Sequence, residues 1–495
     1  MNESYAHSLD FSFFSDTRNQ LEEIILHLES AKLQEHGIIE EYIRTQGNEL
    51  LRLLLQGFLN KQAANEQEVS SVSDADDNHL NHVRKNTGRK LTSLFGSVTV
   101  HRLAYSQRNK ASVFPMDAHL NLYSDQYSDG VRKRIASEVI DRSYDRAVKR
   151  HCETTAGAIG KRQAIALSAD TSRDFVDFYE QRKVENENTD DLLVLTTDGK
   201  GIVMLPDGLR ECTRKNAEKS KQKLQTRLSS GEKKDRKRMA QVAAVYTTRP
   251  NPQSAESVMN LDKESNVRKF RPPSRNKRVW ASVERESGQV IEEAFEEALR
   301  RDPEQQRHWV ILIDGHPHQL GAINRSMKEK QLKATIVMDF IHVLEYLWKA
   351  VWCLFKKGDQ KAEKWVEERA LKILKGQSGR VARGIKQSAS KRGLKKREAI
   401  DKCARYLQKY ESYLRYDEAL SAGYPIASGV IEGACRHLIN DRLDITGARW
   451  SLQGAEAILK LRSLNSSDDW EDYWSFHRRC SGQRNYAGLV LKGAS

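Results

Sequence analysis

The stretch Leu192–Leu205, which reads LLVLTTDGKGIVML, places a single carboxylate, Asp198, in the middle of an apolar and β-branched run. Short runs of Val, Ile, Leu and Thr between turn-forming residues are typical of buried strands. We therefore expect a strand, a sharp turn at the two glycines beside Lys200, and a second strand. A carboxylate inside such a run is costly unless it is paired or holds a metal ion. Asp198 is thus the first candidate for a functional residue.

Two later acids stand in similar surroundings. Asp314 ends the apolar run WVILID, and Glu432, in ASGVIEGACRH, opens a helix after several small residues. Phosphoryl transfer by two divalent ions needs carboxylates that hold the ions about 3.5–4 Å apart, and two or three Asp or Glu suffice for Mg²⁺ because it keeps several waters. We predict that Asp198, Asp314 and Glu432 form one metal site. The alternative is that each acid is an ordinary turn or cap residue.

Composition points to a polyanionic partner. The formal net charge is +14, and charged residues make up 30% of the 495-residue chain. Such a charge favours nucleic acid first and an anionic membrane second, although a basic protein with neither partner is an alternative. We see no apolar run near the ~20 residues that span a bilayer, and no secretory signal. The six cysteines form no CxxC pair, which favours a reducing compartment such as the cytoplasm or nucleoid.

The N-terminal part reads as helices, a hairpin and then helices again. Residues 16–61 have the periodicity of two amphipathic helices, and residues 89–105 alternate like a strand with a turn at Gly96 and Ser97. Three further helices are expected to begin at Asp129, Tyr144 and Gly160. These resemble a helix-turn-helix, whose last helix reads bases with residues near its N-terminus, here Lys161, Arg162 and Gln163. An ordinary helical bundle with a basic end explains the pattern equally well.

The remainder predicts an α/β domain with an insertion. After residue 186 the expected order is strand, strand, strand, helix, strand, helix, strand, helix, which suits a mixed sheet with helices on its faces. Residues 207–238 form a basic segment, including Arg214 and Lys215, for which we favour contact with the DNA backbone over a solvated face. Residues 356–424 read as helices throughout.

These patterns divide the chain into six segments. They are N-terminal helices and linker (1–80), a β-hairpin plus a helix-turn-helix-like DNA-binding region (81–185), the first part of the catalytic core (186–355), a helical insertion (356–424), the last part of the core with the Glu432 helix (425–482), and a tail (483–495).

Several long blocks carry a resemblance to a known family. The blocks are TTDGKGIVM, LIDGHPHQL, TIVMDFIHVLEYLWKAVW and YPIASGVIEGACRHLINDRLDITGARW. From about residue 85 to the C-terminal region, the chain resembles bacterial insertion-sequence transposases of the ISKra type, which are related to the Mutator group. The resemblance implies an RNase H-like catalytic domain whose DDE triad is Asp198, Asp314 and Glu432, with a helical insertion before the Glu.

The same resemblance implies partners and cofactors. It implies two Mg²⁺ (or Mn²⁺) ions, double-stranded DNA at the element ends and at the target, and a homodimer or higher assembly on DNA. The implied reaction is cleavage at the element end, followed by transfer of the freed 3′-OH into target DNA.

Other polar residues near the triad are possible contributors. Lys200, Arg436 and His437 are candidates for DNA contact, whereas His316, His318, Asp339 and His342 are candidate accessory residues. Mutator-type enzymes have a Cys-x2-His pattern after the second Asp, and this chain has Asp339-x2-His342 there. Asp339 and His342 could equally be a buried hydrogen-bonded pair.

Two other functions are compatible with the same residues. One is an RNase H-like nuclease that cuts DNA without joining it. The other is a DNA-binding protein derived from a transposase that has lost catalysis.

Overall fold

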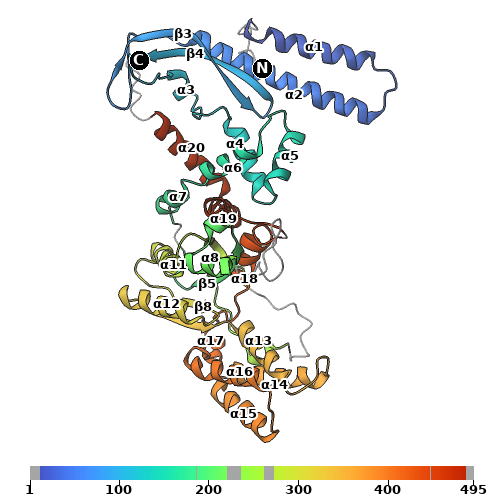
Figure 1. Cartoon of the computed structure of the whole chain (residues 1–495), viewed down its shortest axis with the longest axis vertical. Helices are drawn as coiled ribbons and strands as arrows, with labels where there is room; N and C mark the ends of the chain where they lie inside the picture. Colours follow the sequence, from blue (N-terminus) through green and yellow to red (C-terminus); the bar gives the residue numbers. More distant parts are fainter. Residues whose placement is uncertain (1–11, 185–186, 220–235, 261–271, 446, 487–495) are drawn as a thin grey trace, which may run out of the picture. The chain divides into compact units, whose positions relative to one another are not determined.

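The computed structural model describes residues 12–184, 187–219, 236–260, 272–445 and 447–486. Internal contacts divide the chain into two compact units (Figure 1). The first unit is Met1–Gln181 with Trp470–Ser495, and the second is Arg182–Asp469. No helix among the described residues is long and apolar enough to cross a membrane.

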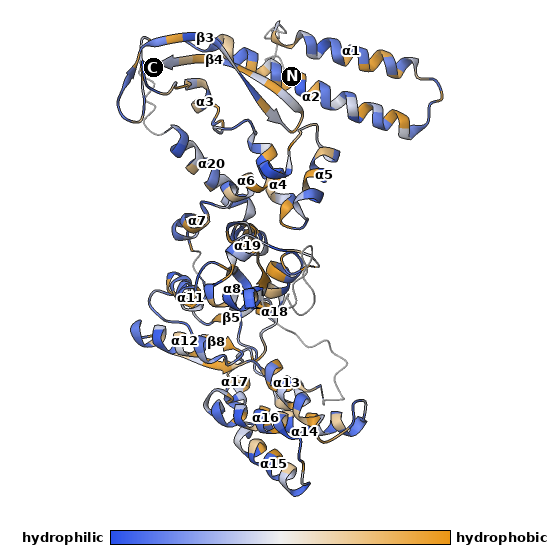
Figure 2. Cartoon of the chain, viewed as in Figure 1, coloured by the Kyte–Doolittle hydropathy of each residue, from blue (hydrophilic) through white to orange (hydrophobic). Residues whose placement is uncertain are grey.

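The first unit begins with a helical hairpin and a long β-hairpin. Its elements are η1 (Ser12–Phe14), α1 (Ser15–Ser30), α2 (His36–Asn65), β1 (Val72–Ser73), β2 (His79–Leu80), β3 (His82–Ser93) and β4 (Gly96–Ser106). Hydrophilic and hydrophobic residues alternate along α1 and α2, as Figure 2 shows. Leu59 of α2 packs against Leu91 and Val98 of the β-hairpin, so an apolar face holds helix and strands together. The hairpin turn lies at Leu94 and Phe95, two positions before the predicted turn, because Gly96 already pairs with Ser93.

The three helices predicted for residues 129–171 are present. The helices of this region are α3 (Pro115–His119), α4 (Asp129–Val139), α5 (Tyr144–Thr154), α6 (Lys161–Thr171) and α7 (Phe175–Gln181). Ser128 and Ser143 cap α4 and α5, since each side chain accepts a hydrogen bond from a backbone N–H of the first turn.

The C-terminal helix belongs to the first unit. From the sequence we expected residues 425–482 to belong to the catalytic core. The structure instead groups the helix α20 (Trp470–Tyr486) with the first unit. His477 is fully buried and its Nδ1 lies 2.6 Å from Oδ2 of Asp174, which is also buried. Tyr473 donates a hydrogen bond to the carbonyl of Thr171. These long-range contacts leave no periodic signal in the sequence.

The second unit contains a five-stranded mixed sheet flanked by helices. The strands are β5 (Leu192–Val203), β6 (Lys237–Thr248), β7 (Arg275–Ser282), β8 (Trp309–Ile313) and β9 (Ala334–Met338), in the order β7-β6-β5-β8-β9. β6 is antiparallel to β5 and β7, whereas β5, β8 and β9 are parallel. The helices between and after the strands are η2 (Pro206–Gly208), α8 (Glu211–Lys219), α10 (Ala255–Val258), α11 (Ser287–Arg301), α12 (Pro317–Glu329) and α13 (Phe340–Val351). The predicted alternation of strands and helices around this sheet is confirmed.

The segment predicted as a strand, a turn and a second strand is one continuous strand. β5 pairs with β6 without interruption from Leu192 to Val203. Neither Gly199 nor Gly201 is among the residues with positive φ, so the backbone passes through both glycines extended. The glycines make room for neighbouring side chains instead: a Cβ at Gly201 would meet Cδ of Lys237 at 2.8 Å. The prediction of a turn here was therefore wrong.

The predicted insertion consists of helices, followed by two helices that return to the sheet. The insertion contains α14 (Gln360–Leu374), α15 (Ser378–Lys391), α16 (Glu398–Lys409), η3 (Glu411–Tyr413) and α17 (Tyr416–Ser421). After it come α18 (Gly429–Cys435), a π-helical turn η4 (Arg436–Asn440) and α19 (Leu452–Ser466). α18 contacts β5 and β6, and α19 contacts β7.

Candidate active site

The sheet brings Asp198 and Asp314 into register. β5 and β8 are parallel neighbours, and Thr196 pairs with Leu312. Asp198 lies two residues after Thr196, and Asp314 lies two residues after Leu312. Parallel pairing thus places both carboxylates at the same level of adjacent segments, although they are far apart in the sequence.

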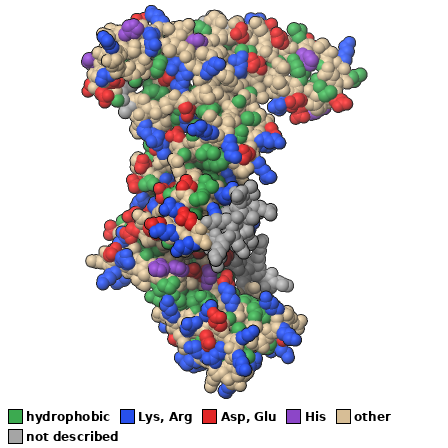
Figure 3. Space-filling model, in the orientation of Figure 1, with side chains coloured by type: hydrophobic (Ala, Val, Ile, Leu, Met, Phe, Trp, Pro, Cys, Tyr) green, Lys and Arg blue, Asp and Glu red, His purple; other side chains and the backbone are tan. Residues whose placement is uncertain are grey.

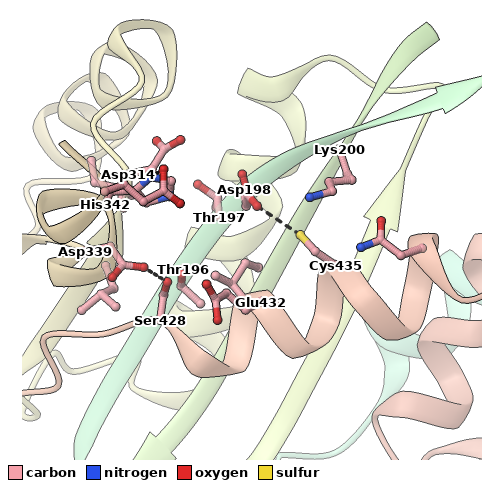
Figure 4. A pocket seen from close by; sticks show the side chains of 15 residues that line it. Thr196, Thr197, Asp198, Lys200, Asp314, Asp339, His342, Ser428, Glu432 and Cys435 are labelled. Atoms are coloured by element: carbon pink, nitrogen blue, oxygen red, sulfur yellow. Dashed lines mark hydrogen bonds and ion pairs between the residues drawn. The ribbon is translucent and has the colours of Figure 1, made fainter. Parts of the chain in front are cut away.

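Glu432, which follows the helical insertion in the sequence, lies near Asp198 and Asp314. It lies in α18, which packs on β5, and its side chain is exposed. A cavity of about 280 Å³ in the second unit is lined by all three residues of the predicted triad (Figure 4). The lining also includes Asp339, Glu345 and Lys200. Such a concentration of carboxylates gives the cavity a negative potential that attracts cations.

The donor chemistry fits a hard divalent ion, but the donors are not gathered around one point. Carboxylate oxygens are the ligands that Mg²⁺ and Mn²⁺ prefer. The buried hydroxyls of Thr196 and Thr197 also line the cavity and have no hydrogen-bond partner among the described residues. Within those residues, no group of three or more His, Cys, Asp or Glu side chains is close enough to hold a metal ion. Binding would therefore require side-chain movement.

Asp198 is held by its own strand and by the Glu432 helix. Its Oδ1 accepts a hydrogen bond from the Gly199 N–H at 2.6 Å, and its Oδ2 accepts one from Sγ of Cys435 at 3.2 Å. Burial, reinforced by the charge of Asp198, raises the pKa of the Cys435 thiol, so the thiol remains a donor. Sequence reasoning missed Cys435. Its spacing of three residues from Glu432, on the same helical face, was the available signal.

Asp314 stands at a tight turn. Its Oδ1 accepts a hydrogen bond from the His316 N–H at 2.8 Å, and Gly315 has a φ of +88°. A Cβ at Gly315 would lie 3.2 Å from Sδ of Met338 and 3.4 Å from the Tyr406 ring. The left-handed backbone is the main reason for glycine here, and a Cβ would also crowd the Met338 side chain.

Asp339 connects the end of β9 to the Glu432 helix. Its Oδ1 caps α13 by accepting a hydrogen bond from the Ile341 N–H at 2.8 Å, and its Oδ2 accepts one from Oγ of Ser428. Asp339 is buried, and it also lines the cavity. His342 lines the cavity too, but its Nδ1 lies 3.9 Å from Glu345. The carboxylate of Asp339 is thus bonded to groups other than His342.

The remaining candidates close to the triad lie at different distances from the cavity. Lys200 lines it, on the same strand as Asp198. His316 and His318 are exposed, with ring centroids 5.6 Å apart, and do not belong to the lining. Arg436 and His437 lie in η4, are exposed, and pair with Asp441 at 3.7 and 3.3 Å. These four side chains would meet a ligand outside the cavity.

The predicted DNA-binding residues of the first unit are on the surface. Lys161, Arg162 and Gln163 are exposed at the N-terminal end of α6, where the predicted recognition helix begins. Nζ of Lys161 pairs with Asp145 of α5 at 2.7 Å. Their surface position leaves them available to a ligand.

The basic segment after β5 is described only in part. Arg214 and Lys215 are exposed on α8, but Nζ of Lys215 pairs with Glu211 at 2.6 Å and Arg214 lies 3.9 Å from Glu218. The following residues 220–235 lie outside the described part of the chain.

The insertion presents a basic face that the sequence analysis did not assign. In α15, Val381, Ala382 and Ile385 are buried. The opposite face carries exposed Arg380, Arg383 and Lys391, and the chain has no acid between Glu368 and Glu398. Figure 3 shows Lys and Arg side chains gathered over these helices, at the lower end of the view. The signal in the sequence was the combination of an acid-free run with helical periodicity.

Comparison with protein-family models and with curated proteins finds no match to this chain.

Proposed function

We propose that this chain is a DNA transposase that cleaves insertion-sequence ends and transfers the 3′-OH into target DNA, using Asp198, Asp314 and Glu432. The observation that carries the proposal is the convergence of these residues on one cavity. Asp198 and Asp314 arrive in register on parallel neighbours, and Glu432 arrives from beyond the insertion. Acids at such separate positions in the sequence have no local structural reason to share a cavity.

The architecture supports an RNase H-like catalytic domain. The strand order β7-β6-β5-β8-β9, with β6 antiparallel to its neighbours, is compatible with that fold, although other mixed α/β folds share such a sheet. The helices α14 to α17 lie between β9 and the Glu432 helix, where the motif resemblance places an insertion.

The chemistry follows from what the chain's own residues can do. Asp198, Asp314 and Glu432 would hold Mg²⁺ or Mn²⁺, which when bound activates the attacking oxygen and stabilises the leaving oxygen. Cys435 orients the carboxylate of Asp198 through its hydrogen bond. The ammonium of Lys200, at the cavity wall, is placed to neutralise a phosphate.

The reaction balances without an energy cofactor. Water attacks a phosphodiester at the element end, and the bond from phosphorus to the 3′ oxygen breaks, which frees a 3′-OH. That hydroxyl then attacks a target phosphodiester, and the displaced target 3′ oxygen leaves with a proton. One phosphodiester is formed for each one broken in the second step, so no ATP is needed.

A strand-transfer assay tests the proposal. The substrate is a pre-cut duplex whose end is taken from the DNA flanking the reading frame, incubated with a plasmid target and Mg²⁺. We expect covalent joining of the 3′ end to the plasmid. Cutting without joining would identify a nuclease, and binding without either would identify a non-catalytic DNA-binding protein.

The basic face of α15 supports duplex DNA as the partner. Arg380 to Lys391 covers about 16 Å of helix at 1.5 Å per residue, long enough to follow several phosphates of one strand. Gly384 and Gln387 separate the cations on this face, and no large apolar side chain is exposed there. A membrane-binding helix would turn its apolar side outwards, whereas here that side is buried in the insertion.

The triple substitution Arg380→Gln, Arg383→Gln, Lys391→Gln is expected to weaken binding to a random-sequence duplex. Each lost phosphate contact removes about 0.9 from the slope of log K against log salt, so three lost contacts make the slope shallower by about 2.7. Fluorescence anisotropy over a series of salt concentrations measures this slope.

A matched control separates this face from bulk charge. Lys328, Lys349 and Lys402 are also exposed in the second unit. Their replacement by Gln lowers the net charge equally and is expected to leave the slope nearly unchanged. Equal effects of the two triple variants would rule out α15 as a specific contact surface.

A further inference from the structure

Three tyrosines of the insertion reach back to the loops that carry the site acids. The bonds are Tyr406 Oη to the carbonyl of Asp314 at 3.2 Å, Tyr410 Oη to the carbonyl of Gly315 at 2.6 Å, and Tyr416 Oη to the carbonyl of Met338 at 2.7 Å. Each hydroxyl donates to a backbone oxygen. Two of the bonds hold the turn at Asp314, and the third holds the residue directly before Asp339.

The rings themselves are firmly packed. Tyr406, Tyr410 and Tyr416 are all buried, and Tyr416 has no exposed surface. Tyr406 stacks on Tyr346 of α13, with ring centroids 4.2 Å apart and an angle of 21° between their planes. Burial raises the pKa of Tyr406 and of Tyr416, so both hydroxyls keep their protons at neutral pH and remain donors.

The contacts join segments that are remote in sequence. Tyr406 lies in α16, Tyr410 directly follows that helix, and Tyr416 opens α17. The first two rings lie against Gly315, since a Cβ there would be in van der Waals contact with each ring, at 3.4 Å. The insertion and the ends of β8 and β9 therefore form one packed unit.

We propose that Tyr406, Tyr410 and Tyr416 are positioning residues through which the helical insertion holds Asp314 and Asp339 at the cavity. The role of the two acids rests on the proposed function. The tyrosines touch neither substrate nor metal; they fix the backbone from which the two carboxylates project. In this account the insertion is a structural support of the site as well as a carrier of basic charge.

Amide hydrogen exchange on the full chain tests the positioning directly. The variant Tyr406→Phe, Tyr410→Phe, Tyr416→Phe keeps the rings and removes only the hydroxyls. We expect exchange in residues 314–316 and 339–341 to become about tenfold faster or more, because each lost hydrogen bond leaves a buried carbonyl without a partner. Tyr413→Phe, in the same part of the insertion, is the control and should leave these segments unchanged.

The affinity for Mn²⁺ tests whether the tyrosines act on the site itself, because tyrosines that only stabilise the insertion would leave this affinity unchanged. In the triple variant we expect Mn²⁺, measured by calorimetry without DNA, to bind about tenfold more weakly, while binding of duplex DNA stays within twofold. If the triple variant does not fold, Tyr410→Phe alone is expected to show the same changes to a smaller extent.

The outcomes separate this inference from the proposed function. Unchanged exchange in residues 314–316 and 339–341 would overturn the positioning role, whatever the activity of the chain. Faster exchange together with unchanged Mn²⁺ affinity would overturn the link between these tyrosines and the site. A third outcome is that the triple variant exchanges faster but the unsubstituted chain binds no Mn²⁺. That outcome would support the backbone positioning and refute the metal site.

Discussion

Replacing Asp198 by Asn is expected to lower metal-dependent DNA cleavage by about a thousandfold or more, because a lost metal ligand removes several kcal/mol of transition-state stabilisation. The same result is expected for Asp314→Asn and Glu432→Gln. All three substitutions keep the side-chain shape and remove one negative charge from a cavity lined by several acids. Folding and duplex binding should therefore be preserved. Cleavage of a labelled duplex under single-turnover conditions measures the effect.

The exposed Asp207, in the turn η2, provides the matched control. It does not line the cavity, so Asp207→Asn is expected to cleave at the rate of the unsubstituted chain. Full cleavage by any one of the three acid variants would remove that residue from the proposed site.

Replacing Glu297 by Gln is expected to cause the largest loss of stability. Glu297 is buried in α11, and its carboxylate accepts hydrogen bonds from Arg278 at 2.5 Å and from Arg301 at 2.8 Å. Both arginines are buried as well. The substitution removes the negative charge from this buried group of ion pairs, which costs roughly 3–5 kcal/mol. Urea unfolding of the full chain, followed by a probe in the second unit, measures the free energy of unfolding.

The carboxyl group of Glu297 is also expected to make the free energy of unfolding depend on pH. Burial alone would raise the pKa of Glu297, but the charges of Arg278 and Arg301 outweigh it and lower the pKa to about 2, from 4.5. The folded state therefore holds the ionised form more strongly than the unfolded chain does. This contribution, roughly 3 kcal/mol, is complete above pH 4.5 and is lost as the pH falls toward 2.

The exposed Glu296, next to it on the same helix, is the control. Glu296→Gln should leave both the free energy of unfolding and its acid dependence almost unchanged. An acid dependence that persists in full in the Glu297→Gln variant would show that other carboxylates are responsible.

Local patterns predicted most of the elements but not their long-range assembly. The strand and helix order around the sheet followed from apolar runs and helical periodicity. The glycines beside Lys200 were misinterpreted because a glycine signals either a turn or a place where neighbours approach closely. In β5 the glycines mark a close approach of neighbouring side chains, and only the pairing with β6 distinguishes this from a turn.

In the candidate site too, single residues could be predicted from the sequence, but the contacts between distant segments could not. Asp198, Asp314 and Glu432 could be chosen from their motifs, and the cavity they share is a product of the register between β5 and β8. The bond from Cys435 to Asp198 joins side chains distant in sequence, and so do the tyrosine bonds to the Asp314 turn. Periodicity reports which face of a helix is buried, but it does not report what that face touches.

A crystal structure of the full chain soaked with Mn²⁺ would show whether Asp198, Asp314 and Glu432 bind one metal ion or a pair of ions together. We expect anomalous scattering from manganese within coordination distance of oxygens of Asp198, Asp314 and Glu432, with their side chains closer together than in the arrangement of Figure 4. The Asp198→Asn variant should show this signal much reduced. A cavity that stays free of manganese at saturating concentration, or an ion bound without any of the three acids, would exclude the proposed metal site.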